Sequence, residues 1–420
     1  MSSNSTNSRQ PELRFSGFAG EWEEKTLGEV GVFVRGLSYS KGDVTTDESS
    51  TLVIRSNNII QDGAVDCKNG LQFVNKAPSS DQVLKKGDIV ICLSNGSSNL
   101  VGKSASFDGE YASIATVGAF CGIYRSSAPI TKYLVQTQAY KKSIDLIKQG
   151  GNGALANLYG RDILGLKFLF PCYAEQQKIV ECLSTADEMI FAQEKKVDTL
   201  KNHKKGIIQH LFPIQGESSP SLRFPGVSGE WDEKPLSHFL HEHKTKSDGK
   251  CEVHSVSVAK GVINQVEYLG RSFAAADTSK YNLVKPNDII YTKSPTGSFP
   301  YGIIKQNKNP YNVIVSPLYA VYTPVTKYLG YILDSYFENP VNTNNYLSSL
   351  VQKGAKNTIQ ITNDTFVSKA MRLPTDANEQ KKIAECLMAL DDNITEATAK
   401  LEALKALKKG LMQQLFPKQD

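Results

Sequence analysis

The residues of this 420-residue chain that are best suited to chemistry are hydrogen-bonding and cationic side chains in its predicted loops. Arginine, lysine, asparagine and serine are the side chains that hold phosphates and read the edges of nucleic-acid bases. Polar loop residues are mostly solvated, so each is only a candidate for contact with DNA. In the first half the candidates are Arg35, Tyr39, Lys41, Arg55, Asn57, Asn58, Ser94, Asn95, Ser97, Asn99 and Lys103. In the second half they are Lys244, Lys246, Lys260, Lys293, Ser294, Thr296, Ser298, Tyr301, Lys305, Lys356 and Asn357.

One stretch comes close to a nucleotide-binding loop and is rejected. A predicted strand at 88–93 leads into Gly96, Gly102, Lys103 and Ser104. The phosphate-binding loop needs four residues between its glycines, and here there are five. The sequence that follows is not helical, so no helix N-terminus would face a phosphate. The matching stretch of the second half lacks the lysine, and we therefore expect no nucleotide site.

No other pattern predicts catalysis or metal binding. The Asn-Pro-Pro-Tyr and Asp-Pro-Pro-Tyr loops of amino-methyltransferases do not occur. His238, His241 and His243 have some of the look of metal ligands, but the first half has no histidine at the matching positions. We interpret them as a polar turn. The sequence therefore predicts a non-enzyme with no metal and no cofactor of its own.

Composition limits the class of protein. A chain of this length suggests two or more domains, and no apolar run approaches the roughly 20 residues of a membrane span. The polar N-terminus is not a secretory signal. Seven scattered cysteines without a Cys-x-x-Cys pair favour reduced thiols in a cytoplasmic protein. The net charge of +5 permits nucleic-acid binding without establishing it.

The elements that must position the loops are organised around one stretch that occurs twice. Residues 175–213 return without a gap at 379–417. Apolar residues recur in each copy in steps of four and three, from Ile179 and from Ile383, which is the spacing of a coiled-coil seam. Two matched copies favour pairing with each other. At roughly 1.5 Å per residue each helix would be about 55 Å long, and we expect the helices to hold the domains apart.

The last third of each copy leaves two interpretations open. Lys204 and Lys408 lie in the predicted seam, where a polar residue usually fixes the register of the pairing. The apolar ends beyond them could cover a partner protein instead of a core. These candidate subunit-docking residues are Ile207, Ile208, Phe212, Leu411, Met412 and Phe416.

The segments before the two helices also match each other. Leu13-Arg14-Phe15 and Leu222-Arg223-Phe224 open the halves, and Trp22 and Trp231 follow; we expect each tryptophan to anchor a loop onto its domain. Short β-branched runs broken by turn residues then predict strand-rich domains. Residues 84–90 match 284–290 and residues 130–134 match 325–329, so the domains share a frame although their surfaces differ. The predicted divisions are 1–172, 173–213, 214–373 and 374–417.

This arrangement resembles the specificity (S) subunit of type I DNA restriction–modification systems from Leu13 to Pro417. The resemblance is carried by the Glu-Gln-x-Lys-Ile starts at 175 and 379, the Leu-Arg-Phe-x-Gly openings, and Gly87-Asp88-Ile89. Asn287-Asp288-Ile289 departs from the family's Gly-Asp, which puts in doubt only the turn before that strand. The fold that the resemblance implies is mixed α/β, with two strand-rich target recognition domains, an antiparallel coiled coil of two long helices and an internal pseudo-twofold repeat.

The same resemblance implies a function. Each recognition domain would read one half of a bipartite, asymmetric sequence in double-stranded DNA, and the helices would set the spacer. Two methyltransferase subunits would dock, followed by restriction/translocase subunits; S-adenosylmethionine, ATP and Mg²⁺ would be used by those partners, with no membrane involved. The alternative is a two-domain protein–protein scaffold without DNA specificity. A self-contained methyltransferase is disfavoured by the missing motifs.

Overall fold

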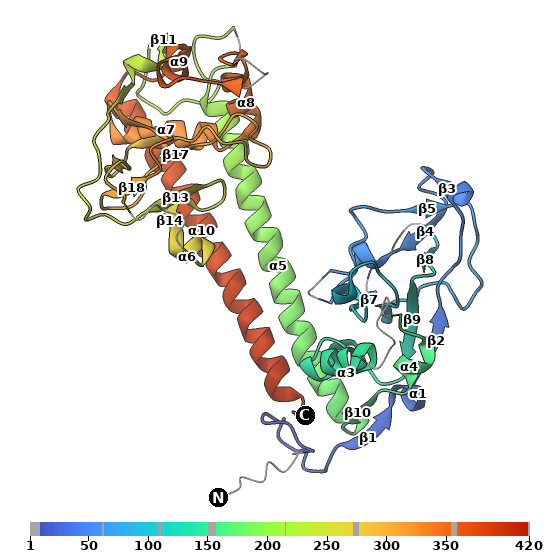
Figure 1. Cartoon of the computed structure of the whole chain (residues 1–420). Coiled ribbons are helices and arrows are strands. Elements are labelled where there is room, and N and C mark those ends of the chain that lie inside the picture. Colours follow the sequence, from blue (N-terminus) through green and yellow to red (C-terminus); the bar gives the residue numbers. More distant parts are fainter. Residues whose placement is uncertain are drawn as a thin grey trace, which may run out of the picture. The chain divides into compact units, whose positions relative to one another are not determined.

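The computed structural model describes residues 9–60, 63–107, 109, 111, 113–149, 157–214, 216–271, 277–353 and 359–418. It divides into two compact units, of which unit 1 combines residues 1–193 with 400–420 and unit 2 contains residues 194–399. Each unit is one strand-rich domain together with one end of each long helix (Figure 1). This mixed strand-and-helix organisation confirms the predicted fold class.

Unit 1 is built on a four-stranded antiparallel sheet of order β2-β9-β6-β7. A second sheet of order β3-β5-β4-β8 contains the parallel pair β4–β8, and β1 pairs with β10. The central strand β6 reads Asp-Ile-Val-Ile-Cys and is buried along its whole length, as expected of an apolar run covered on both faces. The strands are β1 (Glu23–Thr26), β2 (Gly31–Arg35), β3 (Val44–Thr45), β4 (Thr51–Ile54), β5 (Phe73–Val74), β6 (Asp88–Cys92), β7 (Ser104–Phe107), β8 (Ala115–Val117), β9 (Cys121–Ser126) and β10 (Lys167–Phe170). The short helices are α1 (Leu27–Val30), α2 (Thr131–Leu134), α3 (Gln138–Gln149), α4 (Gly160–Leu164), η1 (Lys41–Asp43), η2 (Ser56–Asn58) and η3 (Ser98–Leu100).

Unit 2 repeats the central sheet with the order β12-β19-β16-β17, and its β11–β22 ribbon matches β1–β10. Its remaining strands form the pairs β13–β14, β15–β18 and β20–β21. The strands are β11 (Asp232–Pro235), β12 (Leu240–Glu242), β13 (His254–Ser257), β14 (Gly261–Asn264), β15 (Asn282–Val284), β16 (Ile289–Tyr291), β17 (Ile304–Gln306), β18 (Val313–Val315), β19 (Ala320–Pro324), β20 (Gln352–Lys353), β21 (Ile359–Gln360) and β22 (Ala370–Leu373). The helices are α6 (Gln265–Leu269), α7 (Lys327–Phe337), α8 (Pro340–Ser348), α9 (Asn363–Ser368) and η4 (Leu236–His238).

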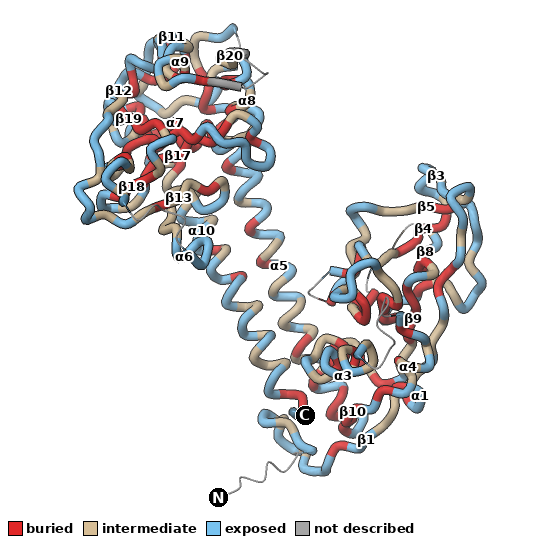
Figure 2. The backbone as a smooth tube through the Cα atoms, viewed as in Figure 1, coloured by how far each residue is buried: buried red, intermediate tan, exposed pale blue. Residues whose placement is uncertain are grey.

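The central sheets of the two units have the same register. Ile89 lies opposite Tyr124 in unit 1, and Ile289 lies opposite Tyr322 in unit 2. Strands β9 and β19 therefore correspond residue by residue with an offset of 198. Both strands are mostly buried (Figure 2). The predicted common frame is thus present at the level of individual residue pairs.

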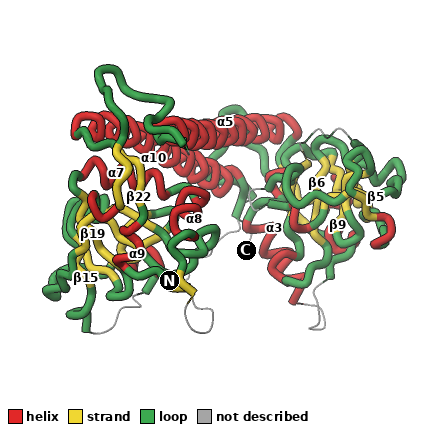
Figure 3. Tube along the Cα trace, turned by 90° about the horizontal axis from the view of Figure 1, so that it is seen from above, coloured by secondary structure: helices red, strands yellow, loops and turns green. Residues whose placement is uncertain are grey.

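The two repeated segments are the helices α5 (Tyr173–Leu211) and α10 (Ala377–Leu415), which Figure 3 shows as unbroken coils. In unit 1 the start of α5 shares a core with the end of α10 through Ile179 and Leu415. In unit 2 the end of α5 shares a core with the start of α10 through Leu211 and Ile383. The helices are therefore antiparallel within each unit. No side chain of the predicted seam is exposed, which confirms the coiled-coil pattern.

The apolar helix ends pack against aromatic residues of their own units. Phe212 lies against Trp231 and Tyr336, with ring centroids 6.0 and 4.5 Å away, and Phe416 lies 6.3 Å from Trp22. Each tryptophan thus anchors a helix end. The remaining candidate docking residues, Ile207, Ile208, Leu411 and Met412, also pack in the cores of the units. All six residues thus pack within their own units, and docking of a partner subunit at these helix ends stays a prediction.

The turns before the central strands resolve the doubt about Asn287. Gly87 has a φ of 88° and Asn287 has a φ of 71°, so both adopt the left-handed conformation. Asparagine is one of the few residues other than glycine that visits this region readily. The main-chain nitrogens of Lys85 and Lys285 donate to Asp88 and Asp288 at 2.8 and 2.7 Å. The departure from Gly-Asp therefore leaves the turn intact.

Candidate nucleic-acid interface

The repeated motifs join each domain to a helix start. Arg14 forms a two-pronged ion pair with Glu175, with Nε–Oε1 and Nη2–Oε2 both at 2.8 Å. Arg223 repeats this with Glu379 at 2.9 Å. The hydrogen bonds to these buried glutamates raise the pKa of both arginines. Such paired contacts fix orientation as well as distance, so the Leu-Arg-Phe openings and the Glu-Gln starts hold the domains on the helices.

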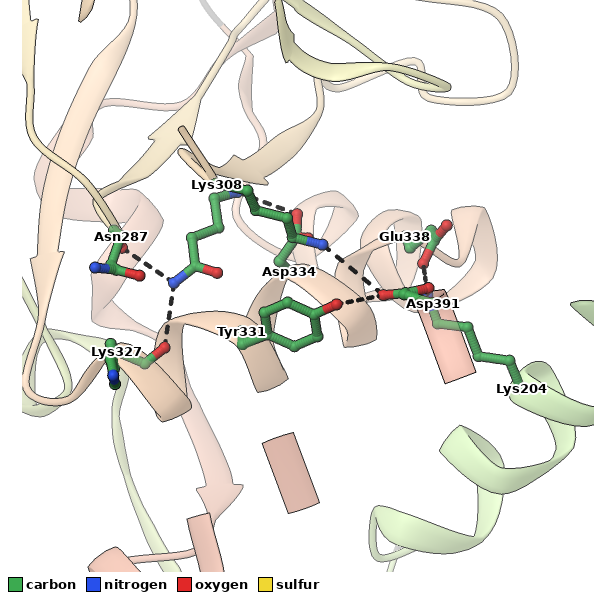
Figure 4. Close-up of polar contacts among 9 residues, drawn as sticks. Lys204, Asn287, Lys308, Lys327, Tyr331, Asp334, Glu338 and Asp391 are labelled. Atoms are coloured by element: carbon green, nitrogen blue, oxygen red, sulfur yellow. Dashed lines mark hydrogen bonds and ion pairs between the residues drawn. The ribbon is translucent and has the colours of Figure 1, made fainter. Parts of the chain in front are cut away.

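A second pair of joints lies in the seam. Lys204 Nζ is 2.6 Å from Asp391 Oδ1, and Lys408 Nζ is 2.6 Å from Asp187 Oδ1. Both lysines and both aspartates occupy matching positions of the repeat, 204 residues apart. Tyr331 donates to Asp391 at 2.5 Å (Figure 4), as Tyr133 donates to Asp187 at 2.8 Å. The ion pairs set the register of α5 against α10, which is the role we expected of the seam lysines.

These tyrosines correct the sequence match between 130–134 and 325–329. That match pairs Tyr133 with Tyr328, whereas the strand register and the contact with aspartate pair Tyr133 with Tyr331. The difference of three residues is about one helical turn. A short similarity at the head of a helix is therefore displaced by one turn from the structural equivalence.

The candidate DNA-contacting residues of unit 1 lie on loops that take no part in these ion pairs. Four of the sequence candidates, Tyr39, Lys41, Arg55 and Asn57, line one cavity of about 510 Å³. Its other lining residues include Phe120 and Gln72. Arg55 is half-buried, and its Nη2 donates to the carbonyl of Gly70 at 2.8 Å. The cavity therefore combines hydrogen-bond donors, a cation and aromatic rings in one concave surface.

The loop after β6 reaches this cavity. Asn95 Nδ2 donates to Ser56 Oγ, on the cavity wall, at 2.8 Å, and Ser94 Oγ donates to Asn157 at 2.6 Å. Asn95 also accepts from the main-chain nitrogen of Ser97. Asn99 and Lys103 lie further along the same loop, and Arg35 is exposed at the end of β2.

Asn58 is a different case and corrects the prediction for that residue. Its side chain is 1% exposed, accepts from the main-chain nitrogen of Arg55, and donates to the carbonyls of Asp66 and Asn69. All of its hydrogen bonds are internal. Asn58 therefore shapes the loop and does not reach a ligand.

In unit 2 the candidates are more scattered. Lys293, Ser294, Thr296 and Ser298 are exposed on the loop after β16, where burial of part of the side chain lowers the pKa of Lys293. Lys244 and Lys260 are exposed as well, while Lys246 donates to Asn282 at 2.6 Å. Lys305 is 8% exposed on β17 and Tyr301 packs against the core. Lys356 and Asn357 lie outside the described residues.

The histidine cluster has a structural role at one position. His243 Nε2 lies 2.8 Å from the buried carboxylate of Asp288. Within the described ranges no three His, Cys, Asp or Glu side chains are placed to hold a metal ion together. In the same part of the chain no helix is both long and apolar enough to cross a membrane.

Sequence reasoning missed two features. The first is the role of Asp187 and Asp391, whose signal was a carboxylate repeated next to each seam. The second is the exposure of Phe120 and Leu318, at 70% and 76%. These two residues align only through the strand register, so the sequence alone gave no reason to pair them.

Comparison with known proteins finds similar sequences for part of the chain. Residues 19–202 match the type I restriction modification DNA specificity domain. The StySPI specificity subunit of Salmonella potsdam is 30% identical over 211 residues, which cover 48% of this chain and 44% of that protein. The EcoKI specificity subunit of Escherichia coli K12 is 30% identical over 171 residues, covering 39% and 36%. The chain thus matches less than half the length of these relatives.

A solved structure extends the likeness to the whole fold. The S subunit of a type I restriction–modification system from M. genitalium superimposes with a TM-score of 0.61 at 13% identity, covering 98% of this chain and 100% of that one. At this identity the likeness concerns the fold. Residues 19–202 are thus similar in sequence to the type I specificity domain, and the fold of the chain is similar to that of a type I S subunit over its full length.

Proposed function

We propose that this chain is a non-catalytic DNA sequence-recognition subunit of a type I restriction–modification complex. The domain of unit 1 reads one half of a bipartite, asymmetric site and the domain of unit 2 reads the other half. The observation that carries the proposal is a shared frame with two different surfaces. The sheet register and the helix joints recur in both units, while the polar residues on the loops differ. Two different half-sites require this combination.

The relatives' names support the choice of partners. Both are specificity subunits of type I restriction enzymes. In our proposal α5 and α10 set the spacer between the half-sites and carry two methyltransferase subunits, which recruit restriction/translocase subunits. Those partner subunits bind and use S-adenosylmethionine, ATP and Mg²⁺, while this chain binds and orients the DNA. The free cysteines support a cytoplasmic setting.

A domain exchange tests the division of labour. Residues 30–170 are replaced by the same segment of another family member, and the chimera is expressed with its methyltransferase partner. Mapping of methylated adenines across the genome should show one changed half-site and one unchanged half-site. A change in both halves would refute the assignment of one half-site to each domain. If the unaltered chain directs no sequence-specific methylation with any partner, the protein–protein scaffold becomes the better reading.

A further inference from the structure

The most exposed large apolar side chain of each unit lies at the same position of the fold. Among the described residues these are Phe120 in unit 1, at 70%, and Leu318 in unit 2, at 76%. Each lies four residues before the tyrosine that pairs with the central strand, Tyr124 or Tyr322. A single exposed apolar residue is ordinary in a soluble domain. Two at one structural position, in loops whose sequences have otherwise diverged, require a reason.

Both side chains are presented by a tight turn of fixed geometry. The nitrogen of Cys121 donates to the carbonyl of Gly118 at 2.8 Å, and the nitrogen of Tyr319 donates to that of Ser316 at 3.1 Å. Phe120 and Leu318 are therefore the third residues of matching four-residue turns. Additional bonds hold each turn. The carbonyl of Phe120 accepts from the nitrogens of Leu93 and Ser94 at 2.8 and 3.2 Å, and the nitrogen of Leu318 donates to Ser316 Oγ at 3.3 Å.

The exposed ring of unit 1 stands beside donors of the kind that read bases. The turn Gly118–Cys121 forms part of the wall of the 510 Å³ cavity, together with Lys41, Arg55 and Asn57. Arg55 Nε is buried without a hydrogen-bond partner. An apolar side chain next to a guanidinium and an amide can contact a thymine methyl while its neighbours bind base edges.

Unit 2 has a related but different setting. Phe33 pairs with Tyr124 and Glu242 pairs with Tyr322. Two residues further along the chain, exposed Arg35 ends β2, and exposed Lys244 lies just beyond the end of β12. The strand register thus assigns a cation to corresponding positions in the two units. The apolar residue itself is aromatic in unit 1 and aliphatic in unit 2, as two different half-sites would require.

We propose that Phe120 and Leu318 are the apolar base-contacting residues of the two domains, each meeting a thymine methyl or an opened base step in its own half-site of double-stranded DNA. This inference rests on the proposed function and assigns specificity-determining positions within it. DNA is favoured over a protein partner because each apolar side chain is accompanied by polar and cationic groups. A protein interface has an apolar core of many residues, whereas a base step accepts one wedge such as Phe or Leu.

The test uses the full chain assembled with its methyltransferase partner. Phe120→Ala and Leu318→Ala are compared with Leu146→Ala and Val341→Ala, which truncate exposed residues of α3 and α8 (68% and 62% exposed). Affinity is measured at one salt concentration for the cognate site and for sites with each base pair changed. Phe120→Ala should weaken cognate binding about tenfold and relax discrimination at one or two positions of one half-site only. Leu318→Ala should do the same at the other half-site.

Three outcomes separate this inference from the proposed function. If the unaltered complex binds no defined sequence, the proposed function fails. If it is specific but Phe120→Ala and Leu318→Ala behave like the two controls, the base-contact assignment fails and the proposed function stands. If the two variants lose the methyltransferase subunits and keep DNA specificity, the turns dock protein and the assignment is again overturned. Because both side chains are exposed, thermal melting of all four variants should match that of the unaltered chain.

Discussion

Asp88 and Asp288 end the same left-handed turn, but these buried carboxylates have different hydrogen-bond partners in the two units. In unit 1, Arg125 Nε and Nη2 both donate to Asp88, at 3.0 to 3.1 Å. In unit 2 the matching strand position is Thr323, whose hydroxyl donates to Asp288 at 2.8 Å. His243, from the neighbouring strand, supplies the second contact. The buried carboxylate is thus the same in both units, while the residues that hydrogen-bond to it differ.

The seam shows the same relation between a shared residue and a changed environment. Lys408 pairs with Asp187, and that carboxylate is 39% exposed. The side chain of Lys204 is only 8% exposed, and it contacts Glu338 as well as Asp391 (Figure 4). Asp391 also lies 3.9 Å from Lys308, which pairs with Asp334 at 2.8 Å. At this position unit 2 therefore contains a network of several ion pairs, whereas unit 1 contains the ion pair of Lys408 with Asp187.

Replacing each of the two seam lysines should destabilise the two units by different amounts. Lys204→Met keeps most of the side-chain volume but leaves Glu338 and Asp391 facing each other without their shared cation. Because Glu338 and Asp391 are 51% and 26% exposed, water can partly solvate them. We therefore expect unit 2 to lose about 2 kcal/mol, which is the typical value of hydrogen bonds to charged groups. Lys408→Met leaves one partly solvated carboxylate and should cost unit 1 about 1 kcal/mol.

The only two tryptophans allow each unit to be followed separately, because Trp22 lies in unit 1 and Trp231 in unit 2. Urea unfolding is monitored by fluorescence in a Trp22→Phe background for unit 2 and in a Trp231→Phe background for unit 1. Equal losses for the two lysine variants would show that seam packing, and not the charged network, sets the cost.

The fold was predictable where the two halves repeat. The matched seams predicted that the two helices pair, and the family resemblance implied that they run antiparallel. The repeated arginines and glutamates are partners in the structure, as Arg14 and Glu175 show. Periodicity and repetition can both be recognised in the sequence without knowledge of tertiary contacts.

The loop surface was harder to predict because exposure there depends on distant neighbours. Asn57 and Asn58 are identical in type and adjacent in sequence, yet one lines the cavity and the other is buried by contacts with residues 66 and 69. The turn that exposes Phe120 is held by Leu93, which directly follows β6 and lies 27 residues earlier, through a hydrogen bond to the carbonyl of Phe120. No pattern within the loop contains that information.

A pH titration sharpens the comparison at Asp334, which is 4% exposed. Burial raises its pKa, but the charges of Lys308 and Lys305 outweigh this effect, and the pKa is lowered overall. In unit 1 the matching residue is neutral Gln136. A carboxylate with a lowered folded pKa stabilises the fold above its unfolded pKa of about 3.9, and this contribution disappears as the pH falls through the folded value.

Asp334→Asn should therefore destabilise unit 2 at pH 7 by about 2 kcal/mol, and the difference from the unaltered chain should shrink as the pH falls below about 4. Urea midpoints of Trp231 fluorescence at several pH values provide the measurement. The urea midpoints of unit 1, reported by Trp22, serve as the internal control. At each pH they should be the same in Asp334→Asn as in the unaltered chain. A difference that stays constant with pH would mean that the carboxylate's charge is not the source of its contribution.

The smallest expected effect concerns the one turn where the units use different residues for the same backbone. Asn287 is the only non-glycine residue with positive φ among those described, and Gly87 holds the matching place. A Cβ at Gly87 would meet no atom within 4 Å, so only the backbone conformation restricts that site. Asn287→Ala should therefore cost unit 2 about 1 kcal/mol, since alanine disfavours the left-handed region. Asn287→Gly should leave its stability almost unchanged, and Gly87→Asn should be tolerated in unit 1 for the same reason. If Asn287→Gly proves as costly as Asn287→Ala, the side chain of Asn287, and not its φ angle, is what the second unit has kept at this turn.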